Sequence, residues 1–140
     1  MRDLAAIQHE ACHIVVGIAL GLRLRKAVIS KGVLEGQNIA GYSWFTSHGS
    51  ALAHAIMCAA GVVWERAHGR ESPIDYRHML EELNVKGDVD GEVRTCLRLA
   101  QILLKNHGTA HKRVTMALLE KDLTDRDIRA IARGEKVTEE

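Results

Sequence analysis

The segment from residue 4 to residue 20 constrains the fold most, because it is apolar on both sides of the helix that its pattern predicts. Five apolar residues recur at helical spacing along one side: Leu4, Ile7, Ala11, Ile14 and Ile18. Asp3 stands at the N-cap position, and the opposite side carries His9 and His13 among small and apolar residues. We therefore expect a buried helix in which each imidazole needs a polar partner.

The rest of the chain predicts a mainly α protein with a small β-hairpin or sheet (α+β), in one domain over residues 1–140. Two β-friendly runs, AVIS and IAGYSWF, flank a polar, glycine-containing stretch and predict a β-hairpin over residues 26–46. Residues 51–134 read as helices and residues 135–140 as a polar tail. The five helices expected there cover about residues 51–68, 72–84, 90–108, 109–122 and 124–134.

Composition excludes several classes of protein. With 46% hydrophobic and 26% charged residues the chain is ordinary for a globular domain, and a net charge of +1 with 4% aromatic residues argues against a nucleic-acid partner. The three cysteines show no Cys-x-x-Cys spacing, which favours a reducing, cytoplasmic location. The longest uncharged apolar stretch, residues 11–22, is shorter than the ~18 residues of a membrane span. We expect no membrane attachment by this chain alone.

The stretch IQHEACHIVV contains the candidate functional residues of the first predicted helix. Residues four apart lie one turn above each other, so His9 and His13 can direct two ring nitrogens at one zinc ion. Glu10 can reach the water bound to that ion without taking a coordination position. Zinc lowers the pKa of such a water toward ~7, and a carboxylate can take its proton during amide hydrolysis. The alternative is a pair of core histidines bonded to backbone or to a carboxylate.

A catalytic zinc site usually has three protein ligands, so a third must come from elsewhere in the chain. Asp75 starts a predicted helix and could turn toward the metal, although Ser72 and Asp75 also fit a capping box. Glu65 is the other candidate ligand. The alternative for Glu65 is that it forms a surface ion pair with a neighbouring arginine. His54 is a weaker candidate, because a helical histidine in this setting is more often satisfied by its own helix. The residues alone leave Asp75 and Glu65 tied.

These segments resemble a known family. HEACHIVVGIALG resembles the HEAGHAVVGLLL segment of the FtsH-type zinc peptidase domain, the proteolytic part of membrane-bound ATP-dependent proteases. Further on, VISKG with AGYSWF is similar to the strand segment that follows the family's active-site helix. AAGVVWERAHG resembles its GGRAAEELIFG, and ESPIDYRHML stands where the family has an aspartate that opens a helix. The likeness covers about residues 5 to 83, and its first motif is the specific one.

The resemblance implies His9, His13 and Asp75 as zinc ligands, Glu10 as catalytic base and Glu65 as a helix residue near the site. The chain departs from the family at Cys12, which replaces a glycine, and in a shorter segment before Asp75 that lacks the Thr-Gly-Ala lead. With only eight residues ahead of His9, we expect a stand-alone peptidase-like domain that acts without an ATPase.

The leading hypothesis is a zinc-dependent, ATP-independent metallopeptidase acting on peptides or unfolded proteins. An extended substrate would add to the exposed strand edge formed by Gly41, Tyr42, Ser43 and Trp44. The alternative for that segment is an ordinary hairpin packed on the helices. The alternative function is a catalytically inactive, peptidase-like binding module, which a fourth ligand such as Cys12 or His54 would indicate. A third reading is a helical interaction domain without metal.

Overall fold

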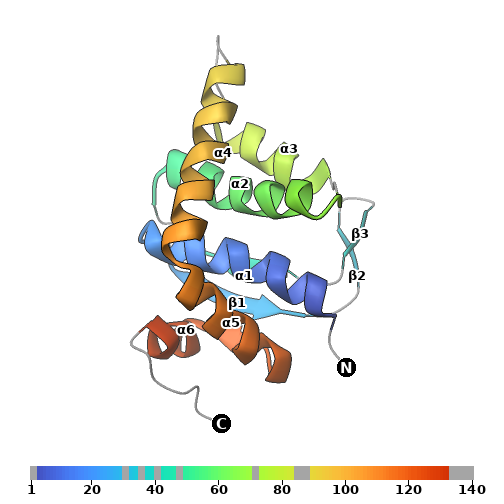
Figure 1. Ribbon diagram of the computed structural model, residues 1–140, viewed down its shortest axis with the longest axis vertical. Coiled ribbons are helices and arrows are strands. Elements are labelled where there is room, and N and C mark those ends of the chain that lie inside the picture. The colour runs from blue at the N-terminus through green and yellow to red at the C-terminus, as the bar shows by residue number, and fades with distance from the viewer. Residues whose placement is uncertain are drawn as a thin grey trace.

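The computed structural model describes residues 3–29, 32–34, 37–39, 42–46, 49–70, 73–83 and 89–132. The helices in these ranges are α1 (Leu4–Ala19), α2 (Ala51–Ala67), α3 (Pro73–Leu83), α4 (Val89–Asn106), α5 (Gly108–Glu120) and α6 (Asp125–Ala132). The strands are β1 (Leu24–Val28), β2 (Gly32–Leu34), β3 (Gln37–Ile39), β4 (Tyr42–Phe45) and β5 (Leu123–Thr124). The prediction of a mainly α chain with a small antiparallel sheet is confirmed (Figure 1).

Helix α1 lies between the two hydrophobic clusters of the molecule. Cys12 and Val16 pack into a cluster formed with α2 and α4. Ile7 and Ile14, both with no exposed surface, pack into a second cluster with β1, α5 and α6. Figure 1 shows α1 in the middle of the molecule, with α2 on one side and β1 on the other. The expectation that both sides of this helix are buried is confirmed, which places its polar residues in the interior.

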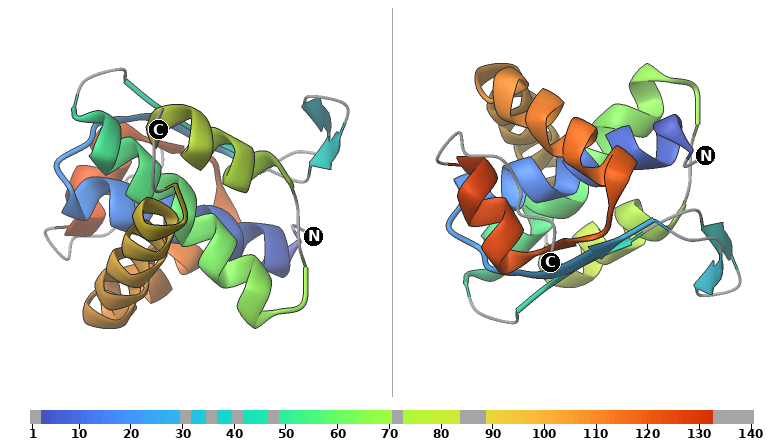
Figure 2. Two further views of the ribbon diagram at one scale, coloured as in Figure 1. Left: turned by 90° about the horizontal axis from the view of Figure 1, so that it is seen from above. Right: turned by 90° about the horizontal axis from the view of Figure 1, so that it is seen from below.

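The main sheet is antiparallel, in the order β4-β1-β5. β1 pairs with β4 in a register that sets Leu24 opposite Phe45 and Val28 opposite Tyr42. The predicted pairing within residues 26–46 is therefore correct, but the simple hairpin is wrong, because β2 and β3 form their own two-stranded sheet between the paired strands. Figure 2 shows this second sheet standing away from the helices. In the described part of the chain, β1 is the central strand and β4 an edge.

β5 was not predicted from the sequence, because two residues are too short for a recognisable alternating pattern. It pairs Leu123 with Ala27, and the side chain of Asp122 accepts a hydrogen bond from the backbone N–H of Ile29 at 3.1 Å. The last predicted helix accordingly starts one residue later than expected, at Asp125. This pairing ties the C-terminal part of the chain to the strand that follows α1.

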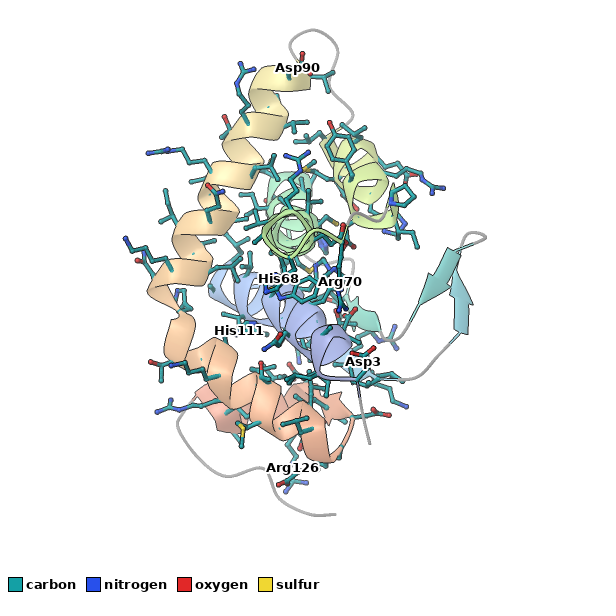
Figure 3. All side chains as sticks on the ribbon, turned by 45° about the vertical axis from the view of Figure 1, so that its right-hand side comes forward. Asp3, His68, Arg70, Asp90, His111 and Arg126 are labelled. Carbon is teal, nitrogen blue, oxygen red and sulfur yellow. The ribbon has the colours of Figure 1, made fainter. Side chains whose placement is uncertain are left out.

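Side-chain caps begin the two helices that carry most of the candidate site. Asp3, which lies at the start of α1 (Figure 3), accepts hydrogen bonds from the backbone N–H groups of Ala5 and Ala6. Ser50 accepts one from the backbone N–H of Ala53 at the start of α2. Both caps were predicted. α2 is followed by Gly69, whose φ of +64° closes the helix as expected of a glycine. The expected cap Ser72 and the tail over residues 135–140 lie outside the described residues.

The described helices differ in length and in apolar content. None of them is both long enough and apolar enough to span a membrane.

Candidate metal centre

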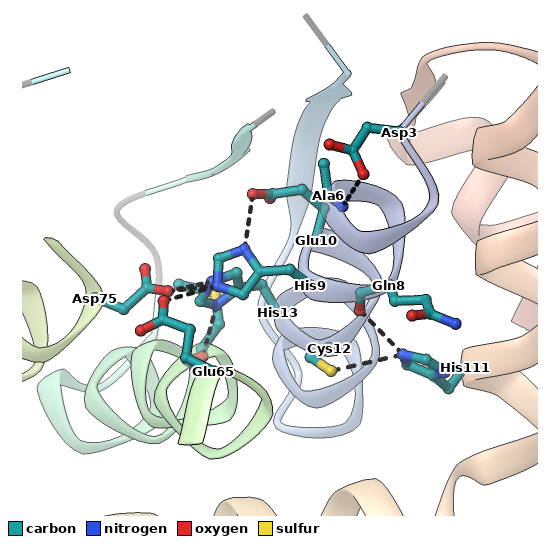
Figure 4. Close-up of polar contacts among 11 residues, drawn as sticks. Asp3, Ala6, Gln8, His9, Glu10, Cys12, His13, Glu65, Asp75 and His111 are labelled. Atoms are coloured by element: carbon teal, nitrogen blue, oxygen red, sulfur yellow. Dashed lines mark hydrogen bonds and ion pairs between the residues drawn. The ribbon is translucent and has the colours of Figure 1, made fainter. Parts of the chain in front are cut away.

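Three side chains from two helices converge at the centre of the candidate site. His9 and His13 project from α1 with their rings edge to face, the ring centroids being 4.9 Å apart. Asp75 reaches them from the first turn of α3, and its Oδ2 lies 2.8 Å from His9 Nε2 and 3.1 Å from His13 Nε2 (Figure 4). Within the described ranges, these three residues form a group whose possible ligand atoms all lie within 4.8 Å of one another.

The ring of His13 has a defined proton position. Its Nδ1 lies 2.9 Å from the backbone oxygen of Met57 on α2. Because a carbonyl oxygen can only accept, Nδ1 carries a proton and donates it. In the neutral ring, Nε2 then presents a lone pair toward Asp75, so two acceptors face each other across 3.1 Å. That geometry requires a proton or a cation between them, and a second-nitrogen hydrogen bond to a carbonyl is typical of metal-binding histidines.

Two further carboxylates lie against the histidines. Glu65 on α2 is 5% exposed, and its Oε1 lies 3.1 Å from His9 Nε2, so it is not the surface side chain that the arginine alternative assumed. Glu10 is 4% exposed, and its Oε1 lies 3.6 Å from His9 Nδ1. The other oxygen of Glu10, Oε2, is buried and has no hydrogen-bond partner among the described residues.

The carboxylates dominate the electrostatics of the cluster. Burial alone would lower the pKa of His9, but the polar contacts with Asp75, Glu10 and Glu65 outweigh it and raise that pKa to about 12. The pKa of His13 is also raised, against the effect of burial, by the charge of Asp75. For Asp75, burial acts to raise the pKa, but the neighbouring His13 and His9 hold it well below its usual range.

A simple charge count shows what this cluster can hold. Three ionised carboxylates with two imidazolium rings sum to −1. The same carboxylates with two neutral imidazoles and one divalent cation also sum to −1. Two protons or one divalent ion therefore leave the cluster with the same net charge. The nitrogen and oxygen atoms present are ligand types that zinc accepts. The residues present fit a zinc ion.

Gly61 on α2 allows the close approach that this site needs. A methyl group at residue 61 would overlap Asp75 Oδ2 and the ring of His13. Sequence reasoning assigned no role to Gly61 or to the Met57 carbonyl. The signal available for both was their spacing, because residues 57, 61 and 65 lie on one face of a helix.

The weaker candidates lie elsewhere. His54 is one turn before Met57 on α2, beside Gly49, and is not part of the three-residue group. The thiol of Cys12 contacts His111 of α5, at 3.5 Å from Nε2. Both alternatives for a fourth ligand therefore lie outside the group that the described residues form.

The predicted substrate strand runs beside α1, the helix that carries both histidines. A side chain at Gly17 would meet the ring of Phe45, which places that end of β4 next to the last turns of α1. Since β1 folds back along α1 and β4 is antiparallel to β1, the Tyr42 end of β4 points toward the histidines. Ser43 pairs with Ala27, while Gly41 and the side chains of Tyr42 and Trp44 lie outside the described residues.

Comparisons with known proteins add no assignment: no protein-family model matches the chain, and no curated protein matches it.

Proposed function

We propose that this chain is a zinc-dependent, ATP-independent metallopeptidase similar to the FtsH-type peptidase domain. The observation that carries the proposal is the convergence of His9 Nε2, His13 Nε2 and Asp75 Oδ2, with distances of 2.8 and 3.1 Å from the carboxylate oxygen. Three protein ligands are the usual number in a catalytic zinc site, which keeps a position for water or substrate. Glu65 contacts His9 but is not part of the three-residue group, so we assign the third ligand to Asp75.

Glu10 is the residue we assign to proton transfer. Zinc bound here would polarise a substrate carbonyl and lower the pKa of a bound water toward ~7. Glu10 is next to the ligand His9, and its buried Oε2 has no hydrogen-bond partner in the described part of the chain. That oxygen is available to accept a proton from the attacking water and to return it to the leaving amine. An unpaired buried carboxylate oxygen costs stability, as is common for groups kept for chemistry.

The substrate we assign is an extended peptide or an unfolded protein. Among the described residues β4 is an edge of the main sheet, and a peptide can add to such an edge through main-chain hydrogen bonds. The direction of β4 along α1 would carry that peptide toward the histidines. The three cysteines are buried free thiols, which supports action in a reducing compartment such as the cytoplasm.

Metal content tests the proposal. The protein, purified without a histidine tag, should hold one zinc ion per chain, and Asp75→Ala should lose it. Glu65→Ala is the matched control, because it removes a second buried carboxylate that contacts the same histidine, and it should keep zinc. Full zinc in Asp75→Ala together with loss in Glu65→Ala would reverse the ligand assignment.

Cleavage of an unfolded protein such as casein separates the two functions that share this site. Zinc binding with hydrolysis supports the peptidase. Zinc binding without hydrolysis of any unfolded substrate or peptide library would instead indicate the inactive binding module. A chain that binds no zinc would remove the proposal.

A further inference from the structure

We infer that Trp64 is a positioning residue that fixes the ring of His9 for metal binding through stacked aromatic contacts. This inference rests on the proposed zinc site and deepens it. Trp64 comes from α2, the same helix that supplies the Met57 carbonyl and the space at Gly61. No sequence pattern had connected this tryptophan with the site.

The two histidines of the site are held in different ways. His13 has a hydrogen bond from Nδ1 to the Met57 oxygen at 2.9 Å. The corresponding nitrogen of His9 lies 3.6 Å from Glu10 Oε1, an ion-pair distance that is too long for a hydrogen bond. The terminal torsion of a histidine side chain is broad, so an imidazole without such a bond can turn away from a metal. Something else must set the orientation of His9.

Ring contacts surround His9 and supply that restraint. The ring of Trp64 lies 5.5 Å from that of His9, centroid to centroid and tilted by 58°, while the His13 ring meets it edge-on. Both distances are in the range of favourable aromatic pairs. Trp64 is only 9% exposed, so it forms a fixed wall. His9 is thereby confined on two sides while its Nε2 faces Asp75.

Trp64 is itself restrained by the end of its helix. The ring of His68 stacks on it, with centroids 4.2 Å apart and planes inclined by 18°. His68 Nδ1 donates a hydrogen bond to the backbone oxygen of Trp64 at 2.8 Å, which holds the covering ring in place. Figure 3 shows His68 at the C-terminal end of α2. Trp64 thus restrains His9, and His68 in turn holds Trp64 in place because its own ring is fixed by a hydrogen bond.

The experiment compares Trp64→Leu with Trp64→Phe. Leucine keeps an apolar side chain but removes the ring, whereas phenylalanine keeps an aromatic wall. Zinc affinity is measured by competition with a chromogenic chelator, and ligand geometry by the visible absorption spectrum of the cobalt-substituted protein. Trp64→Leu should weaken zinc binding about 10- to 100-fold, the usual effect of losing an outer partner of a ligand, and should change the cobalt spectrum. Trp64→Phe should stay within about threefold of the parent.

Leu118→Ala is the control for stability alone. It removes a fully buried side chain from the other hydrophobic cluster and should lower the melting temperature without changing zinc affinity or the cobalt spectrum. If Trp64→Leu does not fold, His68→Ala replaces it, because releasing the covering ring should weaken zinc binding about tenfold, the lower end of the effect expected for Trp64→Leu.

Each outcome decides the matter. Unchanged affinity and spectrum in Trp64→Leu, or equal losses in Leu118→Ala, would overturn the positioning role while leaving the peptidase proposal intact. In the His68→Ala replacement, unchanged affinity has the same meaning. Conversely, a parent protein that binds zinc but cleaves nothing would remove the peptidase proposal and leave the role of Trp64 standing. A parent protein without zinc affinity would end both.

Discussion

Helix α1 takes part in a partly buried histidine contact on each of two sides, and the two contacts differ in charge. On one side, His9 and His13 meet the carboxylates of α2 and α3. On the other, His111 of α5 meets the backbone oxygen of Gln8 at 3.1 Å and the thiol of Cys12 at 3.5 Å. Figure 4 shows both groups on the same helix.

The contact at His111 is satisfied without a cation. Its Nε2–H donates to the Gln8 carbonyl, and the Cys12 sulfur lies close enough to share that proton. Burial raises the pKa of the Cys12 thiol to about 12, so the thiol stays neutral at physiological pH. The histidine cluster on the other side gathers negative charge that only protons or a cation can balance. We therefore interpret His111, which meets neutral groups, as a structural residue. His9 and His13, which meet carboxylates, are candidate metal ligands.

The largest expected effect separates the side of α1 that we propose to be catalytic from the side that faces His111. Glu10→Gln removes the proton acceptor but no metal ligand, so peptide cleavage should fall about 10²- to 10⁴-fold. Zinc content should stay at the level of the parent, and both are measured on the same preparation. Equal cleavage by Glu10→Gln and parent would trace the activity to a contaminating protease.

The pH dependence of zinc binding tests the balance between two protons and one ion. With its pKa raised to about 12, His9 is protonated near neutral pH in the metal-free protein, and zinc must displace that proton. The pKa of His13 is raised as well, so a proton on its ring adds to the competition. Affinity should therefore rise with pH, by at least about tenfold per pH unit between roughly pH 6 and 8. Calorimetry in buffers of different ionisation enthalpy measures the protons released. A pH-independent affinity would contradict the charge count.

A smaller effect is expected from filling the space between α1 and α2. Gly61→Ala should lower the free energy of unfolding by about 1–3 kcal/mol and weaken zinc binding, because the methyl group displaces Asp75 and His13. Gly17→Ala is the matched control: the three atoms nearest to its methyl group belong to the Phe45 ring and the Met57 sulfur, not to Asp75 or His13. Gly17→Ala should lower the free energy of unfolding, measured by chemical denaturation, but leave zinc affinity unchanged. Equal zinc affinities in the two variants would show that Gly61 is not needed by the site.

The smallest effect should come from the neutral contact. His111→Gln removes the ring that joins α5 to Gln8 and Cys12, which should cost about 0.5–1.5 kcal/mol of unfolding free energy. Zinc affinity should stay within about twofold of the parent. A large loss of zinc in His111→Gln would mean that the two sides of α1 are coupled, and the comparison drawn above would fail.

Much of the local structure could be predicted from the sequence. The N-caps Asp3 and Ser50 and the terminal Gly69 act within a few residues of where they stand, so their patterns place α1 and α2 closely. β5 was missed because its two residues form a strand only by pairing with β1, about a hundred residues earlier. Likewise, the separate β2–β3 pairing depends on contacts that a run of β-friendly residues does not specify.

In the candidate site, too, one part could be predicted from the sequence and another part depends on the tertiary structure. The spacing of His9, Glu10 and His13 determines by itself that two imidazoles share one side of a helix, since helical geometry is local. It left Asp75 and Glu65 tied as partners. Only the tertiary structure places Asp75 Oδ2 between both rings, Glu65 against the His9 ring and Gly61 where nothing larger fits. The physical reason is that the contacts of the two histidines join residues more than forty positions apart, and their distances depend on how α2 and α3 pack against α1.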